Sequence, residues 1–156
     1  MRTVLLSVAS LFAVALPGQG ASHADRVPST IRLIAKETRS KMLVDRPPLN
    51  EPSSGDVYWA KATLRNAIPQ FGRPKGAIVG SGVGTLTFRS PPAVFVRSTA
   101  TVPNGTVRVA GLTRVGEPSR VPIVGGTGTY AGARGTCETR SLGGGRALNV
   151  CRLRFP

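Results

Sequence analysis

The most constraining feature of this sequence is a glycine-rich stretch, residues 121–136, which reads VPIVGGTGTYAGARGT. An apolar run enters it and meets Gly125, Gly126 and Gly128. Glycine adopts the positive φ angles that a sharply turning strand requires, and the small residues that follow are compatible with an extended chain at close quarters. The stretch therefore predicts a strand, a tight glycine turn and a second strand.

A glycine-rich turn also occurs in phosphate-binding loops, where a following helix directs its N-terminal N–H groups at the anion. Here Gly132, Gly135 and the triple glycine at 143–145 interrupt any helix, and the Lys-Ser/Thr pair of a P-loop is missing. The sequence therefore disfavours nucleotide binding.

Residues 1–24 have the pattern of a secretory signal peptide. A single basic residue, Arg2, precedes an apolar run, and Ala24 ends a small-residue cleavage site. The run is shorter than the roughly 20 apolar residues that a membrane-spanning helix needs, and no later run replaces it. We expect a secreted chain without a transmembrane segment, in which residues 25–156 form one domain.

The formal net charge is +14, with 21 basic and seven acidic residues. Such a charge favours acidic partners, so an anionic surface or polymer is one candidate. The arginines are spread along the chain, however, which is equally typical of a solvated outer face. Nucleic acid is disfavoured, because aromatic residues that could stack on bases make up only 5% of the sequence.

The single histidine, His23, lies in the predicted signal peptide. Without it the mature chain cannot form a Ser-His-Asp triad, a Cys-His pair or a histidine-ligated metal site. We therefore expect neither a metal nor another cofactor. Acid–base chemistry would fall to carboxylates, tyrosine or water.

Alternating apolar and polar residues, separated by proline and glycine turns, predict eight strands and no helix. The predicted strands are residues 30–44, 57–65, 76–88, 93–102, 106–114, 121–127, 131–141 and 146–155. Antiparallel strands with short connections close most naturally into a barrel, which has no exposed edge. The predicted fold class is thus all-β, an eight-stranded antiparallel β-barrel, whose interior is filled by side chains or holds one small ligand.

Two of these strands indicate an interior lined by small residues. In 57–65 the basic residues Lys61 and Arg65 share one parity, so the other parity is expected to face inward. That parity holds Tyr58, Ala60, Ala62 and Leu64. In 76–88, glycines at 80, 82 and 84 all point to one side, which either admits a neighbouring strand closely or leaves room for a ligand.

The dipeptide Asn104-Gly105 separates two alternating runs and predicts a hairpin turn, since both residues tolerate positive φ. A turn centred on this dipeptide pairs Arg97 with Leu112. One face of the hairpin is then apolar, and the other carries the arginines.

The triple glycine at 143–145 predicts the last hairpin, and its register sets Cys137 opposite Cys151. In a secreted protein, two cysteines at directly opposed strand positions form a disulfide. A redox-active or metal-binding pair is the alternative, although two thiolates without other soft ligands make a poor metal site.

The motif GGTGTYAGARGT, together with Gly55-Asp56 and Asn104-Gly105-Thr106, resembles the dirigent and allene oxide cyclase families and secreted bacterial proteins like them. The resemblance implies an eight-stranded barrel, usually a homo-oligomer, with an apolar cavity that steers a reactive intermediate. Plant dirigent proteins direct the coupling of radicals made by another enzyme, and the cyclases close an unstable epoxide into a ring. Any enzyme activity would then be that of an isomerase or cyclase.

The resemblance also implies site residues. Glu37 is the only candidate for the glutamate that the cyclases place on their first strand, and it becomes the expected catalytic residue. Their asparagine, cysteine and tyrosine have no clear counterpart. Asp56 matches the Gly-Asp step and Arg134 the arginine of the dirigent motif, and with Tyr58 they are the expected ligand-binding residues. The alternatives are a paired structural carboxylate for Glu37 and an outer-face position for Arg134.

Two functions follow. In the first, a secreted barrel binds an apolar small molecule and steers its cyclisation or coupling by shape, because orientation can lower a barrier by several kcal/mol. In the second, a non-catalytic, basic barrel binds or supports an acidic polymer at the cell envelope. A ligand-sized cavity lined by Glu37 would favour the first function, and a fully packed barrel the second.

Overall fold

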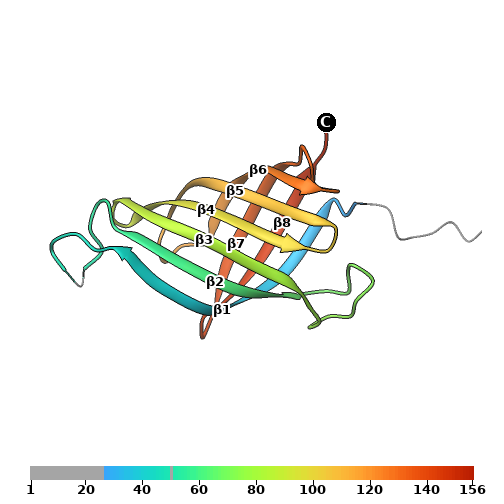
Figure 1. The fold of residues 1–156 in the computed structure, drawn as a ribbon, viewed down its shortest axis with the longest axis horizontal. Helices are drawn as coiled ribbons and strands as arrows, with labels where there is room; N and C mark the ends of the chain where they lie inside the picture. Colours follow the sequence, from blue (N-terminus) through green and yellow to red (C-terminus); the bar gives the residue numbers. More distant parts are fainter. Residues whose placement is uncertain (1–26, 50) are drawn as a thin grey trace, which may run out of the picture.

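The computed structural model describes residues 27–49 and 51–156 (Figure 1). They form eight antiparallel strands that close into a barrel in chain order. The strands are β1 (Thr30–Val44), β2 (Val57–Asn66), β3 (Ile78–Ser90), β4 (Ala93–Val102), β5 (Gly105–Arg114), β6 (Ser119–Gly128), β7 (Arg134–Gly143) and β8 (Arg146–Arg154). The predicted fold class is confirmed. The predicted signal peptide lies outside the described residues, within which no helix could cross a membrane.

The longest strand, β1, closes the barrel. Residues 30–36 pair with β8, and residues 33–44 pair with β2. The pairing with β2 is interrupted by bulges after Glu37 and after Met42, and bulges let a strand bend. Beyond the first bulge, Ser40 pairs with Ala60, whereas Glu37 pairs with Ala62, so Ser40 and Glu37 lie on the same face of the sheet.

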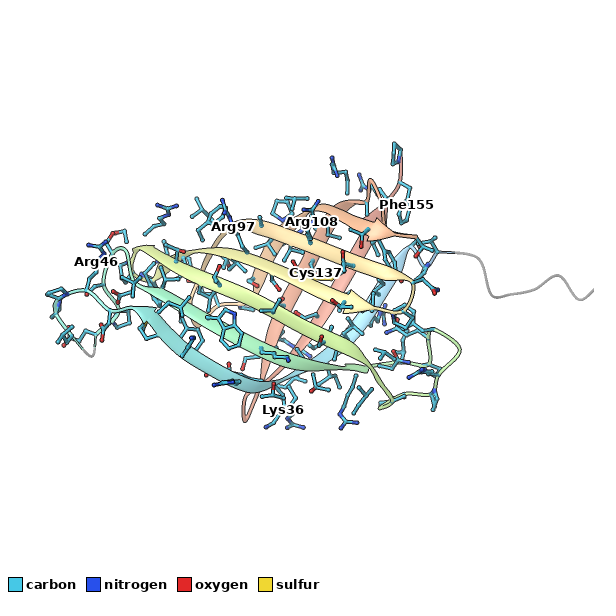
Figure 2. The ribbon with its side chains drawn as sticks, in the orientation of Figure 1. Lys36, Arg46, Arg97, Arg108, Cys137 and Phe155 are labelled. Carbon is cyan, nitrogen blue, oxygen red and sulfur yellow. A yellow bond between two sulfur atoms is a disulfide. The ribbon has the colours of Figure 1, made fainter. Side chains whose placement is uncertain are left out.

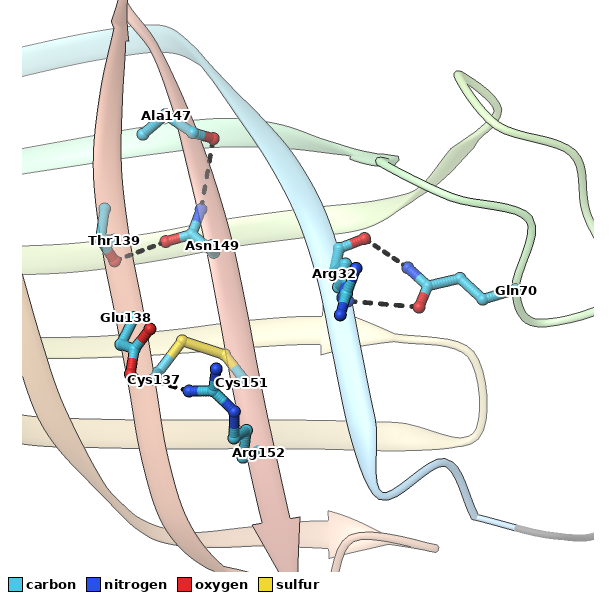
Figure 3. Close-up of a disulfide and its surroundings, with 9 residues drawn as sticks. All are labelled: Arg32, Gln70, Cys137, Glu138, Thr139, Ala147, Asn149, Cys151 and Arg152. Carbon is cyan, nitrogen blue, oxygen red and sulfur yellow. Dashed lines mark hydrogen bonds and ion pairs between the residues drawn. A yellow bond between two sulfur atoms is a disulfide. The ribbon is translucent and has the colours of Figure 1, made fainter.

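One end of the barrel is closed by a buried core. Large side chains from six strands and from the β6–β7 turn pack there with little or no solvent exposure. They include Ile31, Leu33, Leu64, Val102, Val107, Ile123, Tyr130 and Leu153. The β2–β3 loop lies across this end, and Phe71 from that loop packs against the core. Gln70 anchors the loop, because its side-chain amide bonds both the N–H and the carbonyl of Arg32 (Figure 3).

The glycine motif differs from its predicted form. The glycines do not make the turn: β6 continues to Gly128 and pairs with β5, and the chain reverses over residues 129–133. Gly126 lies where a Cβ atom would overlap the carbonyl oxygens of Thr106 and Tyr130. The motif therefore allows β5, β6 and the turn to approach closely, which brings Tyr130 into the core.

The β4–β5 hairpin also corrects the prediction. Arg97 pairs with Ala110, not with Leu112, and the turn consists of Pro103 and Asn104. Asn104 has a φ of 69°, and proline followed by a residue at positive φ is the combination that a type II turn requires. Because the register moves by two residues, the inward and outward faces are unchanged.

The β7–β8 hairpin has its predicted register, and Cys137 and Cys151 are joined by a disulfide (Figure 3). Both cysteines belong to the buried core. The bond therefore links two neighbouring strands on the inside of the barrel.

Candidate functional site

Toward the end of the barrel opposite the closed core, which we call the open end, several inward-facing side chains are partly exposed. Tyr58, Leu86 and Val96 lie in one row of paired, inward-facing positions, and each is only half-buried. At the closed end, Val102 and Val107 have the same inward parity but are buried. At this open end Met42 also faces inward, and 45% of its surface is exposed. The inward-facing side chains are thus fully buried in the closed core and partly exposed around Tyr58, Leu86 and Val96, while Val94, the next inward-facing residue of β4, is buried.

Small residues line the middle of this interior, as the sequence predicted. Ala62 of β2 pairs with Gly82 of β3, which pairs with Ala100 of β4. The alternate glycines of β3 have two explanations. A Cβ at Gly80 or Gly84 would collide with the backbone of β4, so these two positions serve close strand packing. A Cβ at Gly82 would meet Leu64 at 3.6 Å and the carbonyl oxygen of Thr99 at 4.0 Å, both ordinary contacts, so this position leaves room.

A polar cluster of three residues lies at the open end. Glu37 Oε1 accepts hydrogen bonds from Ser40 Oγ at 2.7 Å and from the Tyr58 hydroxyl at 3.3 Å. Glu37 is exposed, and its N–H donates to the carbonyl of Gly145 in the β7–β8 turn. The strands of the described structure carry no other acidic or basic residue on their inward parity. Glu37 and Tyr58 are therefore brought together, at the mouth of the barrel and not deep within it.

Sequence reasoning missed Ser40 as part of this cluster. Its parity in an unbroken strand is that of Lys36, which faces outward. The bulge after Glu37 reverses the alternation and turns Ser40 inward. No local signal in the sequence marks this bulge.

A second polar pair faces the same interior from β7 and β8, of which β8 pairs directly with β1. Thr139 Oγ1 donates to Asn149 Oδ1 at 2.7 Å, and Asn149 Nδ2 donates to the carbonyl of Ala147 (Figure 3). Both residues are half-buried. This pair was also missed, although the predicted hairpin already set Thr139 opposite Asn149, on the same parity as the two cysteines.

Asp56 is not hydrogen-bonded to the cluster of Glu37, Ser40 and Tyr58 in the described structure. It is fully buried, and its two carboxylate oxygens accept hydrogen bonds from the backbone N–H groups of Arg46 at 2.7 Å and Ser53 at 2.8 Å. Its own backbone pairs with Phe88 of β3. These bonds hold the β1–β2 connection against the barrel, which gives Asp56 a structural role. Its ligand-binding role stays a prediction.

Arg134 lies on the outside of the barrel, at the start of β7. Its Nη1 donates to three backbone carbonyls, those of Val124, Gly132 and Ala133, at 3.0 to 3.4 Å. The side chain thereby fastens the glycine motif to the start of the next strand. The structure does not bring Arg134 to the Glu37 cluster, and its ligand-binding role also stays a prediction.

The described residues offer little for a metal. They contain no group of three His, Cys, Asp or Glu side chains that could hold an ion. Both cysteines are engaged in the disulfide. What the inward-facing residues offer chemically is one carboxylate, one phenol and several small polar groups beside an apolar wall.

A family model, the allene oxide cyclase barrel like domain, matches residues 36–150 of the chain. The match begins at Lys36, the last residue of β1 that pairs with β8, and ends in the middle of β8. The chain belongs to this family. No curated protein sequence matches it significantly.

Solved structures extend the comparison for this allene oxide cyclase barrel like protein. A pyocyanin demethylase superposes with a TM-score of 0.66 at 21% identity, covering 80% of this chain and 99% of that chain. A nonspecific heme-binding cyclase that catalyses a [4 + 2] cycloaddition gives 0.57 at 18% identity, covering 83% and 66%. A pterocarpan synthase dirigent protein gives 0.58 at 16% identity, covering 80% and 81%. At these identities the similarity establishes the shared barrel.

Proposed function

We propose that this barrel binds an apolar small molecule in its open interior and steers the cyclisation or coupling of that molecule by shape. The observation that carries the proposal is the position of Glu37, the one charged residue on the inward parity of the strands, beside an accessible apolar wall. Structurally similar barrels include a cyclase and a dirigent protein, which supports this class of activity.

We infer distinct tasks for the three residues of the cluster. Ser40 and Tyr58 both donate to Oε1 of Glu37, so they fix the carboxylate and balance part of its charge. Oε2 has no hydrogen-bond partner among the described residues and is free to accept a hydrogen bond or a proton from the polar end of a ligand. The apolar row of Leu86 and Val96 would hold the rest of the ligand in one orientation.

We further propose that the chain is secreted after removal of residues 1–24. The disulfide supports this, since such bonds persist in oxidising compartments. Mass spectrometry of the protein from a culture medium is expected to show a new N-terminus near Asp25. An intact Met1 on the exported protein would contradict the proposal.

Binding can be tested with a neutral fluorescent probe, N-phenyl-1-naphthylamine, which the basic outer surface does not attract. Gly82→Leu fills the middle of the interior, and the φ of Gly82 lies outside the positive range that restricts side chains. We expect this variant to bind the probe at least about tenfold more weakly, because the added side chain occupies the space. Val83→Leu, on the outer face of the same strand, is the matched control and should bind like the wild type. Equal binding by all three proteins would refute the interior site.

The chemical role of Glu37 is tested separately with Glu37→Gln, which keeps the volume and removes the charge. Suitable substrates are linear molecules that carry a diene and a dienophile, and phenols oxidised to radicals by an added oxidase. Chiral chromatography of the products is expected to show selectivity with the wild type and a changed distribution with the variant. If the distribution is the same and the variant folds normally, Glu37 is structural.

A further inference from the structure

The outer face of the barrel carries a groove that the proposed function does not use. It has a volume of about 400 Å³ and lies over β2 to β5. Its lining includes Trp59, Val83, Thr85, Arg97, Arg108 and Ala110. Figure 2 shows Arg97 and Arg108 projecting from the outside of neighbouring strands.

Strand register explains why a groove forms on this face. Trp59, Thr85 and Arg97 are direct neighbours in one row across β2, β3 and β4. In the next row, Val83 and Thr99 separate Lys61 from Arg108. Short side chains thus form the floor, and the long side chains of Trp59, Arg97 and Arg108 form the walls. With strands about 4.8 Å apart, a row from β2 to β5 spans roughly 14 Å.

The groove is positively charged, and no acidic residue on its four strands balances that charge. No aspartate or glutamate occurs in β2, β3, β4 or β5. The ion pairs of the described residues involve Arg114, Arg120 and Arg152. Arg97 and Arg108 are exposed and have no acidic partner among the residues that the structure describes. A surface of one sign over several strands attracts anions.

A second hollow on the outer face provides the contrast. It lies over β6 to β8 and also contains arginines, Arg120 and Arg140. There Glu138 forms ion pairs with Arg120, at 3.8 Å, and with Arg152, at 2.7 Å. Glu138 partly neutralises the positive charge of that hollow. The β2–β5 groove has no such acidic residue, so it is the better site for an external anion.

Hydroxyl groups border the charged rows. The next row along the strands consists of Thr63, Ser81, Thr101, Thr106 and Thr127. The hydroxyls of Thr106 and Thr127 are 2.8 Å apart and form a hydrogen bond. Hydroxyls both donate and accept, so this row matches the alcohol groups of a sugar.

We propose that the outer face of β2 to β5 binds an acidic polysaccharide. Arg97 and Arg108 would bind the carboxylates, the hydroxyl row the sugar alcohols, and Trp59 the apolar face of one ring. A polymer fits better than a small anion because the groove is open, whereas small-molecule sites usually enclose most of their ligand. A sugar polymer fits better than single-stranded nucleic acid, which usually stacks on several aromatic side chains, and this lining has one.

The proposal is independent of the interior site and can be tested by fluorescence, because Trp59 is the only tryptophan of the sequence. The probes are a galacturonate decamer, the galacturonate monomer, a neutral dextran decamer and a deoxythymidine decamer. The test variant is Arg97→Gln/Arg108→Gln. The matched control, Arg140→Gln/Arg146→Gln, removes two exposed charges from β7 and β8 and so has the same net charge.

We expect the galacturonate decamer to bind best, with an affinity that falls as salt is added. The test variant should bind it roughly a hundredfold more weakly, since charge-assisted hydrogen bonds contribute about tenfold or more each. The control should lose less than about threefold. Equal losses in the two variants would mean diffuse attraction by net charge and would overturn the proposal. Equally tight binding of the monomer or of deoxythymidine, or no binding of the uronate polymer, would overturn it too.

Discussion

The two ends of this barrel are built from the same strands but have different physical characters. At the closed end, Ile31 and Tyr130 are almost fully buried beside loops whose polar groups are hydrogen-bonded. At the open end, Met42 and Leu142 are exposed, and the inward-facing polar groups bond to one another. The comparison leads us to expect that a truncation in the closed core costs more stability than one at the open end.

The largest difference is expected for core truncation. Ile123→Ala at the closed end should lower the free energy of unfolding by about 4 kcal/mol, because Ile123 is 2% exposed and its removal leaves a cavity. Met42→Ala at the open end should cost less than about 0.5 kcal/mol. Urea unfolding of both variants provides the measurement. Similar losses would show that the open end is packed as tightly as the core.

The disulfide should rank second. It closes a loop with a sequence separation of 14 inside the buried core. Replacing both Cys137 and Cys151 by alanine is expected to lower the free energy of unfolding by about 3 kcal/mol. Neutral-probe binding at the open end should persist in conditions where this variant is still folded. Loss of binding without unfolding would contradict the separation of the two ends.

Two inward-facing asparagines that both pair with Leu33 give a matched pair of different burial. Asn66 is fully buried, and its Nδ2 donates to the carbonyls of Gln70, Arg73 and Pro74. Asn66→Ala leaves these carbonyls without their donor and should cost about 2 kcal/mol. Asn149→Ala at the half-buried wall should cost less than about 1 kcal/mol. Equal costs measured by thermal unfolding would remove the contrast.

The smallest effect concerns Tyr130 and alkaline pH. Burial raises the pKa of Tyr130 above its ordinary value of 10.0, because the phenolate would lose its hydration. A raised pKa in the folded state gives stability that is complete below pH 10 and falls as the pH rises above it. Tyr130→Phe loses the hydrogen bond to Pro103, which should cost about 1 kcal/mol near pH 8.

The difference in stability between wild type and Tyr130→Phe should therefore shrink as the pH rises above 10. Urea midpoints of both proteins across this range test it, and comparing the two cancels the titration of lysines. A difference that stays constant with pH would mean that Tyr130 titrates in the folded protein as it does in the unfolded chain.

The sequence by itself determined the number of strands, the inward faces of β2 and β4, the cysteine pair and the family resemblance. These features depend on patterns of a few residues: the two-residue period of a strand, and turns that fix which positions are opposed. Glycines 143–145 set the register that joins Cys137 to Cys151 without knowledge of any other strand.

Only the tertiary structure decided where the chemistry lies. The bulge after Glu37 turned Ser40 inward, and the turn at Pro103-Asn104 set the β4–β5 register, which pairs Arg97 with Ala110 and Thr99 with Arg108. Both depend on how a strand fits its neighbours. A register shift of two residues leaves the parity of each strand unchanged, so the pattern of one strand does not reveal it. Burial was decided in the same way: Glu37 shares the parity of Ile31, yet it lies at the open mouth, because depth along the barrel is a property of the closed sheet and not of one strand.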